Sequence, residues 1–206
     1  MSSVFPGWTV VWATCASVAI VFGVSYSFAA FFHPLADEFA ALRADVSMVF
    51  GLSSLLYFAL GAPAGALSDR FGPRVTGIAG MLIIALGLAA CTVATTLPQI
   101  YAAYGLGVGV GIALVYTPAM GAVQPWFVKH RGLASGIASA GIGAGTLLVP
   151  PITGLLCEHL GWRSAMLCLA ALCAVAGVAA AACLDRDPAR RGWLPDGVRL
   201  VPPTDR

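Results

Sequence analysis

The charged residues of this chain gather in short segments, and one of them is GALSDRFGPR, which begins at Gly65. It places Asp69 beside Arg70 and five residues before Arg74, between two long apolar runs. A carboxylate near guanidinium groups can form charge-assisted hydrogen bonds that hold one conformation and break in another. Gly65 and Gly72 allow close approach and a tight turn. The segment predicts a conformational latch or, in the simpler interpretation, a basic anchor that keeps one loop on one side of a membrane.

A second basic segment, WFVKHRGLASGIASAG, leads into another apolar run. Lys129 and Arg131 stand at its start, and Gly136 and Gly141 follow within the run. Gly141 and Gly145 have the spacing that lets two membrane helices approach closely. We therefore expect basic groups at a membrane edge and a tightly packed helix behind them.

Hydroxyl groups are the remaining candidates for binding a ligand within the apolar runs. Because successive helical residues turn by about 100°, Ser135, Ser139 and Thr146 share one face of their run. Tyr57 lies on a polar stripe of another run, and Tyr116 is the best single candidate for a substrate contact. The alternative interpretations are helix packing for the stripes, back-bonding to the helix's own carbonyls, and aromatic packing for the tyrosines.

Enzymatic, metal and nucleotide chemistry have no matching pattern in the sequence. No nucleophile–base pair or metal cluster is apparent, and the six cysteines form no CxxC motif. The run GLGVGVG contains neither GxGxxG nor a Walker motif, so helix packing explains its glycines better than phosphate binding. A net charge of +2 does not suggest nucleic acid. We expect no enzyme activity, no metal, no cofactor and no nucleic-acid partner.

The elements that must position these residues are membrane spans. Of the 206 residues, 59% are hydrophobic and 10% charged, against about 25% charged in soluble domains. Each span needs about 20 apolar residues, and the sequence predicts an all-α integral membrane bundle over 1–184 with a polar tail over 185–206. The six expected spans are residues 9–32, 46–67, 75–96, 99–125, 133–157 and 164–184.

Basic residues predict the direction of the spans, because Lys and Arg concentrate in cytoplasmic loops. Nine of the eleven fall on one side of the expected topology, and only Arg43 and Arg163 fall on the other. Both termini are therefore expected in the cytoplasm. The nine are Arg70, Arg74, Lys129, Arg131, Arg186, Arg190, Arg191, Arg199 and Arg206.

Two motifs carry a resemblance to a known family. GALSDRFGPR resembles the loop signature G-x-L-a-D-r-x-G-r-R of the major facilitator superfamily, with Pro73 in place of a basic residue. WFVKHRGLASGIASAG resembles the fifth-span signature YFxKRRxLAxGxAxAG of its monocarboxylate-transporter-like group, with Trp126 and His130 as departures. PGW before the first span and GWR before the sixth also match. The expected first span has no Lys and the expected fourth no Arg, which fits bacterial organic-acid members better than mammalian ones.

The resemblance implies one half of a twelve-span carrier, because the superfamily is built from six-span halves. It implies a secondary transporter in a bacterial inner membrane that moves a small organic acid, with or without a proton, by alternating access. The implied partners are bilayer lipid, the organic anion, and a second six-span half or a second copy. Since the spans contain no Asp, Glu, Lys or Arg between their ends, the charged part of the pathway is expected in that second half. The alternative is a non-transporting membrane fragment or a regulatory membrane protein that binds a partner.

Overall fold

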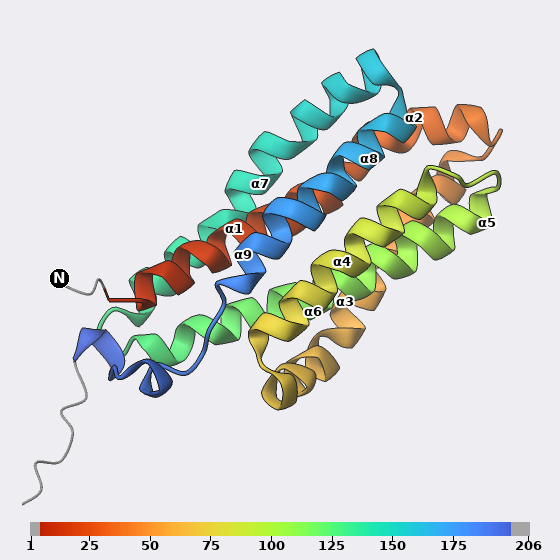
Figure 1. Ribbon diagram of the computed structural model, residues 1–206. Helices are drawn as coiled ribbons and strands as arrows, with labels where there is room; N and C mark the ends of the chain where they lie inside the picture. The colour runs from red at the N-terminus through yellow and green to blue at the C-terminus, as the bar shows by residue number, and fades with distance from the viewer. Residues whose placement is uncertain (1–4, 199–206) are drawn as a thin grey trace, which may run out of the picture.

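The computed structural model describes residues 5–198, which form a bundle of helices joined by short turns (Figure 1). Arg199 and Arg206, two of the basic residues counted above, lie outside this range. The α-helices are α1 (Gly7–Tyr26), α2 (Phe28–Glu38), α3 (Arg43–Phe71), α4 (Pro73–Cys91), α5 (Leu97–Ile100), α6 (Gly107–Val123), α7 (Arg131–Leu160), α8 (Trp162–Leu172) and α9 (Val178–Ala182). Short π-helical turns, Tyr101–Leu106 and Cys173–Gly177, and 3₁₀ turns, Gln124–Trp126, Ala189–Arg191 and Pro195–Gly197, complete the described elements.

Six helical segments of the described chain are long and apolar enough to cross a membrane, which confirms the all-α, six-helix fold. Several run past the expected ends. The first continues to Glu38, where a polar loop was expected, and the second begins at Arg43. Polar side chains can be solvated at the membrane edge while the helical backbone keeps its own hydrogen bonds, so polarity does not end these helices. The six segments are Gly7–Glu38, Arg43–Phe71, Pro73–Cys91, Leu97–Trp126, Arg131–Leu160 and Trp162–Ala182.

Helices α1 and α6 form the centre of the bundle. α1 packs along α7 and against α6, and α6 packs in turn against α3 and α4. α8 and α9 pack against α4, so α4, α8 and α9 cover one side of the central pair (Figure 1). α3 and α7 bury the smallest share of their residues. The core lies between the central helices and the covering layer, and the other side, formed by α7, α1, α6 and α3, stays more open.

Glycine determines how closely α7 approaches α1. A Cβ atom on Gly141 would lie 2.2 Å from the carbonyl oxygen of Cys15. A Cβ atom on Gly145 would lie 2.0 Å from that of Ala19. The predicted close packing at these two glycines is confirmed. Pro150 and Pro151 both lie within a continuous α7.

One arginine joins three helix ends at the end of the bundle opposite the start of α1. Arg163 Nη1 contacts Glu38 Oε1 at 2.6 Å, and the indole N–H of Trp162 donates to Glu38 Oε2 at 2.6 Å. Arg163 also donates to the carbonyls of Thr92 and Ala94, at 3.0 and 3.1 Å. The GWR motif therefore connects the end of the first span, the turn after α4 and the start of the sixth span.

Arg163→Gln should destabilise the bundle by about 1–2 kcal/mol, a figure reduced because both charges are partly exposed. Arg163→Lys should not restore the loss, because an ammonium group cannot reproduce the planar guanidinium geometry. Thermal unfolding in detergent measures the effect. Arg43→Gln is the matched control, since Arg43 is exposed on the same side, and an equal loss in that variant would contradict the assignment.

Candidate functional site

The loop between the second and third spans is a single residue. α3 ends at Phe71, and Gly72 turns the chain into α4 with φ of +87°. A residue with a Cβ is strained at that φ, which explains why position 72 of the motif is glycine. Asp69 lies on the last turn of α3, with most of its side chain exposed. Its carboxylate is thus available to a partner from elsewhere in the chain.

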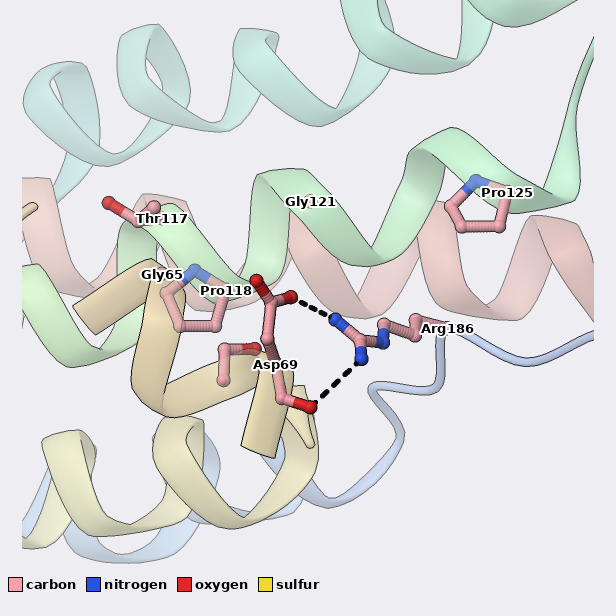
Figure 2. A pocket seen from close by; sticks show the side chains of 8 residues that line it. Gly65, Asp69, Thr117, Pro118, Gly121, Pro125 and Arg186 are labelled. Carbon is pink, nitrogen blue, oxygen red and sulfur yellow. Dashed lines mark hydrogen bonds and ion pairs between the residues drawn. The ribbon is translucent and has the colours of Figure 1, made fainter. Parts of the chain in front are cut away.

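That partner is Arg186, which follows the last span (Figure 2). Arg186 Nη1 forms an ion pair with Asp69 Oδ1, and Nη2 donates to the Asp69 carbonyl at 3.1 Å. Within the described residues Asp69 pairs with neither Arg70 nor Arg74, the two arginines of its own motif. The Arg70 guanidinium instead lies over the Phe71 ring, 5.3 Å from its centroid. Arg74 lies beyond the turn, on α4.

A cavity of about 390 Å³ lies beside this ion pair, between α3 and α6 (Figure 2). The Asp69–Arg186 pair lies at its edge. Gly65 also lines it, where a larger side chain would reach toward Thr117. The full lining is Gly65, Ser68, Asp69, Thr117, Pro118, Gly121, Pro125 and Arg186.

The two candidate tyrosines meet deeper in the bundle. The ring centroids of Tyr57 and Tyr116 are 5.9 Å apart, and Phe22 contacts both at 6.0 and 5.3 Å. All three rings are half-buried, and they come from α3, α6 and α1. The aromatic packing considered above is therefore present. Neither tyrosine hydroxyl has a hydrogen bond within residues 5–198, so both are available to a ligand.

The hydroxyls of α7 have other contacts. Ser135 Oγ accepts a hydrogen bond from Gln124 Nε2 at 3.1 Å. Thr146 bonds back to the Ile142 carbonyl at 2.9 Å, the back-bonding alternative named above. Ser139 is half-buried on the same face. Within the described chain no hydrogen bond joins these groups to the tyrosines.

The second motif begins in the loop before α7 and meets the segment after the last span. The Asp196 carboxylate accepts hydrogen bonds from the Val128 and Lys129 N–H groups, at 3.2 and 2.9 Å, and lies 3.6 Å from His130 Nδ1. Arg131 Nε donates to the Phe127 carbonyl at 3.2 Å. Nothing in the sequence indicated that Asp196 would accept these hydrogen bonds, apart from the PDG segment that is typical of a turn.

Gly136 of this motif is exposed on α7, where a Cβ would meet nothing within 4 Å. Its place in the motif therefore has no packing explanation in the described residues. Gly141, in contrast, lies against the α1 backbone, as described above.

Backbone N–H groups, chiefly that of Lys129, hold the pKa of Asp196 below its usual value. A carboxyl with a lowered folded-state pKa stabilises the docked segment above its unfolded pKa, and the stabilisation is lost as pH falls through the folded value. Docking should therefore be constant from pH 7 to about 5 and weaken below about pH 4. At pH 7, Asp196→Asn should speed amide hydrogen exchange at Val128 and Lys129. Asp37→Asn, at the opposite end, is the control, and unchanged exchange in Asp196→Asn would contradict the docking.

Comparison with known proteins decides the family. Residues 8–203 match the profile described as Major Facilitator Superfamily. The chain belongs to the major facilitator superfamily. Within this superfamily it is similar to Monocarboxylate transporter 13 of Bos taurus, with 36% identity over 167 residues. Monocarboxylate transporter 11 of Homo sapiens is 34% identical over 166 residues, and Monocarboxylate transporter 4 of Mus musculus 31% over 170. The resemblance to the monocarboxylate-transporter-like group is confirmed.

These matches cover 81% of this chain but only 39%, 35% and 36% of the lengths of the three relatives, in the order named. The chain thus corresponds to little more than a third of their length. As a member of this superfamily it is a multi-pass membrane protein with a transporter fold.

Proposed function

We propose that this chain is one six-helix bundle of a secondary transporter that moves a small organic acid by alternating access. The single observation that carries the proposal is the ion pair of Asp69 with Arg186, at one end of the bundle and beside a cavity. A partly exposed ion pair contributes little to stability. It can still bias a two-state equilibrium if it forms in only one state. Asp69 and Arg186, with Gly65, Arg70, Gly72 and Arg74 around them, form the proposed latch.

The second bundle of the carrier is proposed to be a separate six-span unit or a second copy of this chain. Two features support this: superfamily carriers place substrate between two bundles, and the α7, α1, α6 and α3 side is the more open one. Coupling to a proton remains a prediction that concerns the other bundle, because the described spans carry charge only near their ends.

We propose that both termini face the cytoplasm, because Lys and Arg concentrate in cytoplasmic loops. The loop at Arg70 and Arg74 and the loop at Lys129 and Arg131 lie at the same end of the bundle as the start of α1, which supports this orientation. The three relatives named above are vertebrate proteins, so a bacterial inner membrane stays a prediction. Family membership favours a carrier over an enzyme.

For the substrate, we propose that Tyr57 and Tyr116 donate hydrogen bonds to the carboxylate, with Ser135, Ser139 and Thr146 along the same open side. A carboxylate entering an apolar region needs donors, and these hydroxyls have the required chemistry. The competing hypothesis is a non-transporting membrane fragment or a regulatory membrane protein, which predicts no uptake at all.

Removing one tyrosine hydroxyl tests this assignment. Tyr116→Phe and Tyr57→Phe should each raise the KM for lactate or pyruvate uptake into proteoliposomes by roughly three- to tenfold, the loss of one hydrogen bond of about 0.5–1.5 kcal/mol. Tyr101→Phe is the control, because the Tyr101 hydroxyl donates to the Asp45 carbonyl near the span's outer end. Unchanged KM in both variants, with uptake intact, would remove the tyrosines from the site while leaving transport standing.

A further inference from the structure

A second cavity, of about 470 Å³, lies where the end of α3, the start of α4 and the segment after α9 meet. It is separate from the Asp69-side cavity between α3 and α6, although Asp69 and Arg186 border both. Five arginines and three aspartates line it. Such a density of charge beside a membrane span requires an explanation beyond the latch.

The charges of this cavity do not cancel. Arg186 pairs with Asp69, Arg191 Nε lies 2.7 Å from Asp185 Oδ2, and Arg190 Nε lies 3.4 Å from Asp187 Oδ2. Each of the three acids therefore has an arginine partner. Arg70 and Arg74 have no acidic partner within residues 5–198, and both are exposed. The cavity therefore presents two uncompensated guanidinium groups.

The first residues of α4 add to this positive potential. Pro73, Arg74 and Val75 line the cavity, and they form the first turn of a 19-residue helix. The N-terminal end of a helix carries a partial positive charge that favours anions. Guanidinium groups also match phosphate oxygens in geometry. An anionic phosphate group is the ligand that this combination suits best.

An exposed apolar path leads away from the cavity along α4. Val75, at the cavity, is 57% exposed, and Leu82 and Leu86 are 43% and 70% exposed. At about 100° per residue these three side chains fall within about 40° of one another. The rise from Val75 to Leu86 is about 17 Å, close to one leaflet of a hydrocarbon core of about 30 Å. Phe71, 52% exposed, lies at the start of the same path.

We propose that this cavity binds the headgroup of an anionic phospholipid, with Arg70 and Arg74 on the phosphate and an acyl chain along the α4 stripe. A free phosphate would use the arginines but would gain nothing from Val75, Leu82 and Leu86. Because the bound lipid would contact both α3 and the segment after α9, it would stabilise the conformation in which Asp69 and Arg186 are paired. The site is independent of what the bundle transports.

Native mass spectrometry of the purified 206-residue chain in detergent tests the proposal. The wild type should retain phosphatidylglycerol in preference to phosphatidylcholine. The double variant Arg70→Gln/Arg74→Gln should bind phosphatidylglycerol about 20- to 30-fold more weakly, at about 1 kcal/mol per arginine. Lys129→Gln is the matched control, since Lys129 is an exposed base at the same end that does not line the cavity.

Unchanged preference in the double variant, or an equal loss in Lys129→Gln, would overturn the site. A second measurement uses the wild type alone and so does not depend on how a variant folds. Short-chain phosphatidylglycerol should displace the bound lipid at far lower concentration than inorganic phosphate. Equal displacement by inorganic phosphate would show a site for a soluble anion and would overturn the lipid assignment.

Discussion

Gly145→Ala should lower the thermal unfolding midpoint of the bundle by roughly 5–10 °C, the largest stability effect we expect from one methyl group. The added Cβ would lie 2.0 Å from the Ala19 carbonyl oxygen and 2.8 Å from its Cα. These are backbone atoms of α1, so no side-chain rotation can relieve the overlap and the two helices must separate. Overpacking of this kind costs about 1–3 kcal/mol.

Gly143→Ala is the matched control, because it lies on the same helix with nothing within 4 Å of a built Cβ. Alanine is the better helix former, so this variant should keep or slightly raise the midpoint. Circular dichroism in detergent is sufficient for the comparison. Equal midpoints for Gly145→Ala and the wild type would mean that α1 and α7 are not in this close contact.

Reversing the charge of Asp69 should reduce uptake about tenfold. Asp69→Arg places a third guanidinium beside Arg186 and Arg70. The substitution removes the Asp69–Arg186 ion pair and adds charge repulsion in the conformation that this pair stabilises. The pair is partly exposed, so folding stability should change little. A change of about 1.4 kcal/mol in the free-energy difference between two transport states nevertheless changes the ratio of their populations tenfold.

The swap Asp69→Arg/Arg186→Asp should recover most of the lost uptake, because it restores the pair with its polarity reversed. A mismatched swap, Asp69→Arg/Arg190→Asp, is the control, since Arg190 pairs with Asp187 instead. Initial rates of labelled lactate uptake, normalised to reconstituted protein, measure the rescue. Equal rates for the matched and mismatched swaps would exclude a specific Asp69–Arg186 latch.

Hydropathy and glycine spacing predicted the parts of this molecule that depend on local sequence. The six spans follow from run length, and the contact at Gly141 and Gly145 follows from helical geometry. The helix ends were harder to predict from the sequence. The polar residues Asp37 and Glu38 indicated a loop, but a helix can continue into the polar edge of the membrane.

The contacts of the site depend on tertiary structure and could not be read from spacing. Arg186 lies 117 residues from Asp69, and the nearer arginines gave the more obvious partners. The available signal was the alternation of Asp and Arg directly after the last span, on the same expected side as the loop. Asp196 had a weaker signal, because one carboxylate in a turn does not indicate which amides it will accept.

Uptake by the purified protein tests the central claim most directly. The chain, isolated from its native membrane with any partner that co-purifies, is reconstituted into proteoliposomes and given labelled lactate or pyruvate. A carrier should show saturable uptake above that of protein-free liposomes, with competition by excess unlabelled acid and exchange for preloaded acid. Uptake no greater than in protein-free liposomes for every organic acid tested, in a preparation that contains a second bundle, would contradict the account.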